Sequence, residues 1–160
     1  MLGSLLAAII LLGAFLWVEG HTFFPMLDLS LFRKRIFAAS TTSAVLNYMS
    51  LYFVIFLMPF YLLQGRGFNP AEAGLLLTAQ PIVMAIAAPI SGLLSDRIGS
   101  RVLSTLGMAI MAVGLFLLSR LGPTSSNPTI LISLAVTGLG TGVFISPNTS
   151  ALLGSAPRQR

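Results

Sequence analysis

Five long segments of the sequence contain no charged residue, and all nine basic and four acidic side chains lie between or beyond them. A helix needs about 20 apolar residues, or about 17 at the short end, to cross the hydrocarbon core of a bilayer. A charge in mid-bilayer costs about 2.5–3.5 kcal/mol or more, which explains its exclusion from these segments. The pattern predicts an all-α, polytopic membrane helix bundle of about five transmembrane helices. The predicted spans are residues 2–18, 36–63, 74–94, 102–119 and 129–147.

The composition excludes several other classes of protein. Hydrophobic residues make up 56% of the chain and charged residues only 8%, whereas soluble domains carry about a quarter charged residues. The absence of cysteine excludes disulfide frameworks and thiolate metal sites. The basic residues form short clusters and not a stripe along one face, so we expect the lipid bilayer as partner and no nucleic acid. We expect no metal site.

The first segment differs from a secretory signal peptide. Such a signal has a basic start and a small-residue cleavage site, but the first basic residue here is Arg33 and the segment ends in Phe15-Leu16-Trp17. Trp17, followed by Glu19, is typical of a span that leaves the bilayer through its interface. We therefore expect residues 2–18 to cross the membrane.

The basic residues are distributed unequally between the two membrane faces. If all five segments cross, one face receives the loops 19–35 and 95–101 and the tail from about residue 148, with seven of the nine basic residues. The other face receives only Arg66 and Arg120. The positive-inside rule then places both loops in the cytoplasm and the N-terminus outside. We expect a multi-pass protein of the plasma membrane.

Polar side chains inside the spans recur at helical spacing. Small and polar residues also hold transmembrane helices together, so both packing and pore lining stay open for Asn47, and packing is favoured for the others. Gly138, Gly140 and Gly142 predict a seam of close helix packing. The candidate pore-lining residues are Asn47, Ser43, Ser50, Gln80, Thr137 and Thr141.

The segment 92–101 predicts a tight cytoplasmic turn between two spans. Gly92 permits close helix contact, and Gly99 permits the reversal of the chain. Asp96 could accept hydrogen bonds from the exposed N–H groups of the next helix. Arg97 and Arg101 could anchor the turn at the lipid headgroups and pair with Asp96. The alternative is an ordinary capped loop on the positive-inside face.

The pattern G-x-L-x-D-R-x-G-x-R in this segment resembles the loop motif of the major facilitator superfamily, with Ser100 in place of a commonly basic residue. The resemblance makes Gly92, Asp96, Arg97, Gly99 and Arg101 the candidate gating-loop residues. Three further stretches, 25–37, 67–76 and 147–151, resemble the fourteen-span drug:proton antiporter branch of that superfamily, in the same order.

The resemblance implies a partial major facilitator fold. Residues 1–18 would be a span of the extra central pair, and residues 19–35 the cytoplasmic linker. Residues 36–121 would form a three-span repeat of the C-terminal transporter domain, and residues 122–160 the start of the next repeat, which is cut short. The other half of the transporter would then lie elsewhere in the same chain or in a partner chain.

The implied function is membrane transport. The sequence is interpreted as part of a proton-coupled efflux antiporter for small amphipathic molecules, working by alternating access. No cofactor is expected, because a proton gradient would supply the driving force. No carboxylate or histidine lies inside a span, and His21 is the only histidine, so neither a catalytic site nor the proton-carrying group is visible and an enzyme is not expected. The alternatives are a small membrane protein that binds or regulates a partner and an inactive transporter fragment.

Overall fold

The computed structural model describes residues 2–21 and 32–155, and every regular element in these ranges is a helix. The π-helical turn η2 continues α2 without a break. The predicted all-α class is confirmed. The elements are α1 (Leu2–His21), α2 (Arg35–Phe60), η2 (Tyr61–Gly65), α3 (Pro70–Leu77), α4 (Ala79–Ile98), α5 (Ser100–Ser119) and α6 (Asn127–Ser155).

Four helical segments in the described part of the chain are long and apolar enough to cross a membrane. They are Arg35–Gly65, Pro70–Ile98, Ser100–Ser119 and Asn127–Gly154. These four match the second to fifth predicted spans. The first predicted span forms α1, whose apolar part, Leu6–Phe15, is shorter. Membrane crossing by α1 stays a prediction, and most of the predicted linker 19–35 lies outside the described residues.

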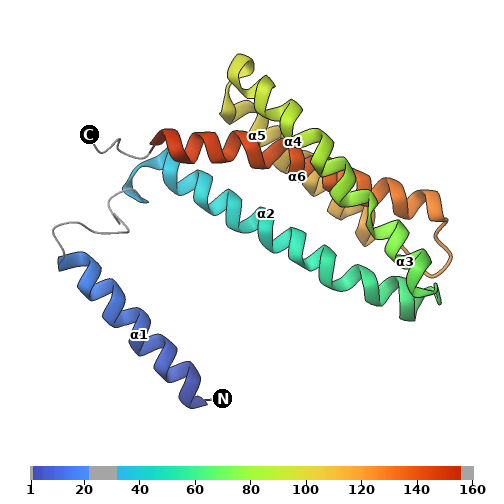
Figure 1. Cartoon of the computed structure of the whole chain (residues 1–160), viewed down its shortest axis with the longest axis horizontal. Helices are drawn as coiled ribbons and strands as arrows, with labels where there is room; N and C mark the ends of the chain where they lie inside the picture. Colours follow the sequence, from blue (N-terminus) through green and yellow to red (C-terminus); the bar gives the residue numbers. More distant parts are fainter. Residues whose placement is uncertain (1, 22–31, 156–160) are drawn as a thin grey trace.

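Helix α6 is the centre of the bundle. It packs along α5 and α4, and α2 contacts it less extensively (Figure 1). The predicted division between two repeats, at residues 121 and 122, falls in the turn between α5 and α6. The division itself stays a prediction.

Glycines allow α6 to approach its two neighbours this closely. A Cβ atom added to Gly140 would lie 2.7 Å from the Cα of Met111 in α5. One added to Gly142 would lie 2.8 Å from the Cβ of Ala87 in α4. Real Cβ contacts are longer than this, so larger side chains would force the helices apart. The packing seam predicted from these glycines is confirmed.

Prolines explain where the helices break and widen. Pro81 has no N–H group to bond the carbonyl of Leu77, and α3 ends at that residue. The hydroxyl of Thr78, in the break, donates to the carbonyl of Leu75 at 2.6 Å. Pro59 lies inside α2, which continues to Phe60 and then widens into the π-helical turn η2.

Several helix ends differ from the hydropathy boundaries. The third span was predicted over 74–94, but α3 and α4 together cover Pro70–Ile98. The fifth was predicted to end at residue 147, but α6 continues through Pro147 to Ser155. Hydropathy reports where apolar residues stop, whereas a helix continues into polar residues that still satisfy its backbone.

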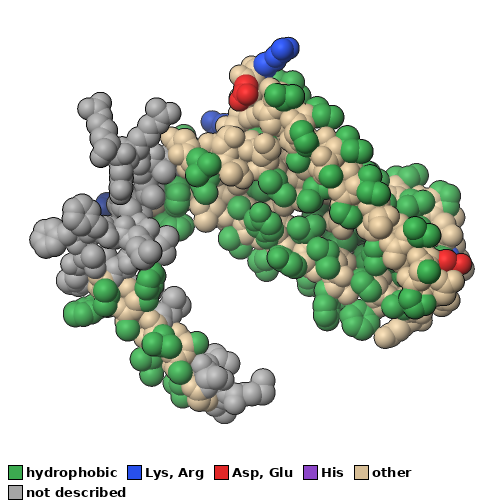
Figure 2. Space-filling model, viewed as in Figure 1, with side chains coloured by type: hydrophobic (Ala, Val, Ile, Leu, Met, Phe, Trp, Pro, Cys, Tyr) green, Lys and Arg blue, Asp and Glu red, His purple; other side chains and the backbone are tan. Residues whose placement is uncertain are grey.

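The surface of the bundle agrees with a membrane environment. On the face shown in Figure 2, charged side chains gather near the two ends of the bundle, and hydrophobic side chains cover the length between them. Large apolar side chains stay exposed along all four membrane-length segments, for example Phe53, Ile86, Phe116 and Ile132. In water such a surface would aggregate, and in a bilayer it contacts lipid.

Candidate functional site

The segment 92–101 brings α4, α5 and α6 together at one end of the bundle. A Cβ atom added to Gly92 would lie 2.8 Å from the hydroxyl oxygen of Ser146 in α6. The neighbouring Ser91 donates a hydrogen bond to the carbonyl of Val143 at 2.7 Å. The prediction that Gly92 permits close helix contact is confirmed, and α6 is the helix that it contacts.

Gly99 alone forms the turn between α4 and α5. Its backbone angles, φ 94° and ψ 139°, lie in a region that residues with a Cβ atom rarely adopt. Its N–H group donates to the carbonyl of Ser95 at 2.9 Å and closes the end of α4. The predicted reversal at Gly99 is confirmed. The predicted loop 95–101 was too long, because the helices extend to both sides of this glycine.

The predicted capping role of Asp96 is wrong. The first turn of α5 has no side-chain cap, because Asp96 lies inside the last turn of α4 and its side chain is exposed. The side chains of Arg97 and Arg101 are exposed as well. Among the described residues no ion pair joins these two arginines to Asp96. The three charged groups are therefore available at the surface beside the turn at Gly99.

The polar face of α2 is directed toward α5 and α6. Asn47 is fully buried, and its side-chain nitrogen lies 3.8 Å from the sulfur of Met108. Its carbonyl oxygen has no hydrogen-bond partner. Ser43 is half-buried, and the hydroxyl of Ser50 donates to the carbonyl of Leu46 in its own helix at 2.9 Å. Asn47 is thus the one residue of this face with an unsatisfied, fully buried polar atom.

The other three candidate pore-lining residues lie within the contacts between helices. Thr137 donates to the carbonyl of Leu134 at 2.7 Å, and Thr141 approaches the sulfur of Met111 at 3.5 Å. Gln80 is 5% exposed, and its side-chain nitrogen has no partner. Burial of these side chains agrees with packing. Contact with a substrate path stays a prediction for all six residues.

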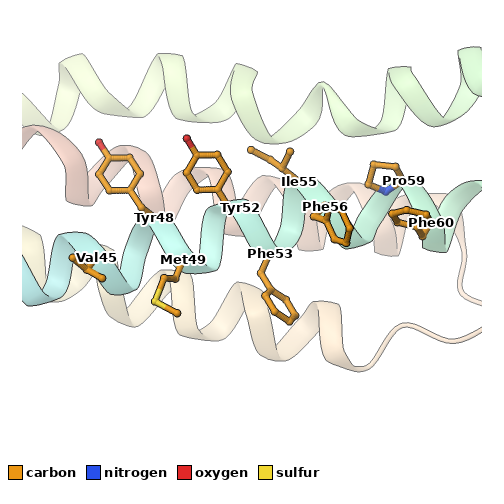
Figure 3. Close-up of a pocket in the computed structure, with 9 residues that line it drawn as sticks. All are labelled: Val45, Tyr48, Met49, Tyr52, Phe53, Ile55, Phe56, Pro59 and Phe60. Atoms are coloured by element: carbon orange, nitrogen blue, oxygen red, sulfur yellow. The ribbon is translucent and has the colours of Figure 1, made fainter. Parts of the chain in front are cut away.

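A row of exposed aromatic side chains follows α2. Tyr48, Tyr52, Phe56 and Phe60 are spaced by four residues, and we call them the aromatic row. Each of the four is 47% exposed or more. They line a shallow groove of about 900 Å³ (Figure 3). The other lining residues, also from α2, are Val45, Met49, Phe53, Ile55 and Pro59.

None of the described residues that line the groove is charged. The rings of Phe56 and Phe60 lie 5.3 Å apart between centroids, at 54° to each other. In Figure 3 the hydroxyl ends of Tyr48 and Tyr52 point in the same direction, while Met49 and Phe53 lie on the other side of α2. The sequence interpretation missed this groove, although the spacing of four places the rings on one helical face.

A second set of contacts ties two turns together at the opposite end of the bundle. The hydroxyl of Tyr61 donates to the carbonyl of Gly122 at 2.8 Å. The guanidinium of Arg66 donates to the carbonyl of Pro123 and lies over the ring of Phe68, 5.6 Å from its centroid. The turn after α2 is thereby fixed to the turn before α6. The sequence interpretation assigned Arg66 only to the less basic face.

Comparison with known proteins assigns the family. The profile of the Major Facilitator Superfamily matches residues 40–160, which include α4, α5, α6 and the turn at Gly99. The chain belongs to this superfamily. The resemblance found in the loop motif is confirmed, and the chain is a transporter sequence and not an enzyme.

Several curated transporters of the superfamily are similar to this major facilitator chain. It is 36% identical over 134 residues to the riboflavin transporter RibZ of Clostridioides difficile, an alignment that covers 84% of this chain and 29% of RibZ. It is 29% identical over 146 residues to the multidrug resistance protein Stp of Mycobacterium tuberculosis, covering 91% of this chain and 27% of Stp. It is 28% identical over 157 residues to the methyl viologen resistance protein SmvA of Salmonella typhimurium, covering 98% of this chain and 32% of SmvA. The chain spans less than a third of the length of these relatives.

Proposed function

We propose that this major facilitator chain is part of a proton-coupled antiporter that exports small, amphipathic, aromatic molecules by alternating access. The antiporter would belong to the fourteen-span branch of the superfamily. The aromatic row of α2 is the observation that carries the proposal. Four exposed rings along one helix offer a surface on which a flat aromatic molecule can stack without a fixed set of hydrogen bonds. Such a surface tolerates substrates of different shape.

The names of the relatives support this substrate class. Riboflavin and methyl viologen, named in RibZ and SmvA, are both flat and aromatic, and methyl viologen is a cation. Aromatic faces attract cations by about 0.5–2 kcal/mol, most strongly where water is excluded. Among the residues that the structure describes, no basic side chain that would repel a cation lines the groove of the aromatic row.

The remaining parts of the antiporter would lie outside the described helices. The chain covers 27–32% of the three relatives, so the substrate path would be completed by the rest of the transporter, in the same chain or a partner chain. The four membrane-length segments contain no carboxylate or histidine in their central parts. The proton-carrying group would therefore belong to the rest of the transporter.

The turn at Gly99 would act as the gating element on the cytoplasmic side. Arg97 at the end of α4 and Arg101 at the start of α5 support a cytoplasmic position of this turn, by the positive-inside rule. The N-terminus would then lie outside the plasma membrane. During alternating access the two halves of the transporter rock around a central site. The single-residue turn at Gly99 would couple the adjacent ends of α4 and α5, and the exposed side chains of Asp96, Arg97 and Arg101 could contact the other half.

The test uses the complete transporter that contains this sequence, in inverted membrane vesicles energised by a proton gradient. Uptake of methyl viologen is measured for the unchanged protein, Tyr52→Ala and Phe116→Ala at equal abundance. Phe116 is the matched control, an exposed aromatic residue of α5 outside the groove. We expect Tyr52→Ala to raise KM about two- to tenfold, which corresponds to the loss of one aromatic contact. Phe116→Ala should leave KM unchanged.

Two results would contradict the proposal. Equal KM values for the two variants would exclude the aromatic row as a substrate surface. Uptake that survives complete collapse of the proton gradient by an uncoupler would exclude proton coupling.

A further inference from the structure

A pocket of about 600 Å³ lies where the first turns of α2 and α5 meet the C-terminal half of α6. It is separate from the groove of the aromatic row, and no residue lines both. We call it the basic pocket. Its polar lining includes Arg35, Ser40 and Ser43 of α2, Arg101 and Ser104 of α5, and Asn148 of α6.

The walls of the basic pocket are held together by a hydrogen bond between two helices. Asn148 is 6% exposed, and its side-chain nitrogen donates to the carbonyl of Ser40 at 3.1 Å. This contact joins α6 to the start of α2 across 108 positions of sequence. This hydrogen bond fixes the positions of α2 and α6 on two sides of the pocket. The shape of the pocket therefore follows from the packing of the helices as well as from the exposed side chains.

The chemistry of the basic pocket favours an anion. Two guanidinium groups line it, and none of the described lining residues carries a carboxylate. Ser100 and Thr105 of α5 add two more hydroxyl groups to the lining. The first turn of α5 begins at the pocket without a side-chain cap, so main-chain N–H groups there can donate hydrogen bonds to an anion.

The position of the pocket in the membrane favours a lipid phosphate over other anions. Arg35 is the first residue of a membrane-length segment, so the pocket lies at the level where a span enters the lipid headgroups. Ile36 and Ala39 add apolar surface to the lining. A phosphate ester with an attached lipid would place its charge between the arginines and its chains along the exposed surface of α2.

We propose that the basic pocket binds the phosphate group of an anionic phospholipid, held by Arg35 and Arg101. Guanidinium groups bind phosphate through paired, charge-assisted hydrogen bonds. A soluble phosphate ion has the same binding chemistry and is the alternative source of the group. The pocket shares Arg101 with the candidate gating loop, so the test measures lipid retention and not transport.

The test is native mass spectrometry of the purified complete transporter that contains this sequence, with added phosphatidylglycerol or phosphatidylcholine. The unchanged protein is compared with the double variant Arg35→Ala/Arg101→Ala. Arg97→Ala/Arg120→Ala is the matched control, because it removes the same charge from two exposed arginines that do not line the pocket. Inorganic phosphate is titrated in a separate arm as competitor.

We expect the unchanged protein to retain phosphatidylglycerol in preference to phosphatidylcholine. The pocket variant should lose about tenfold or more of that retention, since two charge-assisted contacts are removed. The control variant should retain phosphatidylglycerol within about twofold of the unchanged protein, because it changes only the net charge at a screened surface. If inorganic phosphate at millimolar concentration displaces phosphatidylglycerol, the basic pocket binds phosphate as proposed, but the soluble ion is its ligand.

A third variant keeps the test valid if the double variant fails to fold. Ala39→Phe fills the pocket from an exposed position of α2 and keeps both arginines. It should lower retention of phosphatidylglycerol without a change in net charge. Equal retention by the pocket and control variants, or by Ala39→Phe and the unchanged protein, would overturn the proposal, as would equal binding of the two lipids.

Discussion

Gly140 of α6 lies directly against the main chain of Met111 in α5, and an added Cβ atom would be 2.7 Å from the Cα of Met111. Because the obstacle is backbone, the neighbouring helix cannot relax by a change of rotamer. We expect Gly140→Ala to lower the free energy of unfolding by about 1–3 kcal/mol, the usual cost of overpacking. Circular dichroism during unfolding in detergent measures this change.

The control for this substitution is Gly74→Ala. Gly74 lies inside α3, and an added Cβ atom would meet nothing within 4 Å. The control should be neutral or stabilising, since alanine favours a helix over glycine by about 1 kcal/mol. An equal response of the two variants would show that the α5–α6 contact is looser than the structure describes.

Gly99→Ala tests backbone strain at the turn of the gating loop. At Gly99 an added Cβ atom meets no neighbour, but φ is +94°. We expect a loss of about 1–3 kcal/mol in the free energy of unfolding, from conformation alone. Gly122→Ala is the matched control, because Gly122 also lies in a turn between helices, has open space and has no positive φ. Unchanged stability of Gly99→Ala would mean that the turn adopts another conformation.

Asp96→Asn tests whether the charge beside this turn acts in transport. The Asp96 side chain is exposed and does not cap α5, so its loss should leave folding and membrane insertion intact. In the complete transporter we expect a lower transport rate at equal membrane abundance, because the charge would contact the other half during gating. Glu72→Gln, an exposed carboxylate near the other end of the bundle, serves as control. Equal rates for Asp96→Asn and the unchanged protein would exclude a gating role.

Tyr61→Phe tests the contact between the turn after α2 and the turn before α6. The substitution removes the hydroxyl that donates to Gly122 at 2.8 Å and changes little else. We expect unfolding to become easier by about 1 kcal/mol, the net value of one such hydrogen bond. Tyr52→Phe is the control, since Tyr52 is 66% exposed and should shift stability by less than about 0.5 kcal/mol. A smaller effect at Tyr61 than at Tyr52 would contradict the assignment.

The positions of the four membrane-length helices could be predicted from the sequence because charge is excluded from a bilayer core. The close contact at Gly92 and the turn at Gly99 could also be predicted, because glycine has no Cβ atom and is the residue that best tolerates such positions. The residues at which the helices end could not be predicted from the sequence. Asp96 was assigned to a loop because hydropathy falls there, yet α4 continues to Ile98.

Contacts between distant residues left no local signal. The hydroxyl of Tyr61 and the carbonyl of Gly122 are 61 positions apart, and Asn148 and Ser40 are 108 positions apart. The aromatic row is different, because its spacing of four is visible in the sequence. Whether such a row is buried or exposed depends on which neighbours cover α2, and spacing alone does not report that.

Asn47→Leu separates packing from function at the buried face of α2. Asn47 is fully buried with only a weak contact to the sulfur of Met108, and its carbonyl oxygen is unsatisfied. Leucine has the same branching as asparagine and no polar atom that needs a partner, but its methyl groups are bulkier, so we expect the free energy of unfolding to change by no more than about 1–3 kcal/mol. We expect the transport rate of the complete protein to fall at equal abundance, because Asn47 would then no longer offer a polar group to the transport path. Ser133→Ala is the control, a buried hydroxyl bonded to Thr129 of its own helix at 2.8 Å. A stable Asn47→Leu protein with full transport would assign Asn47 to packing alone.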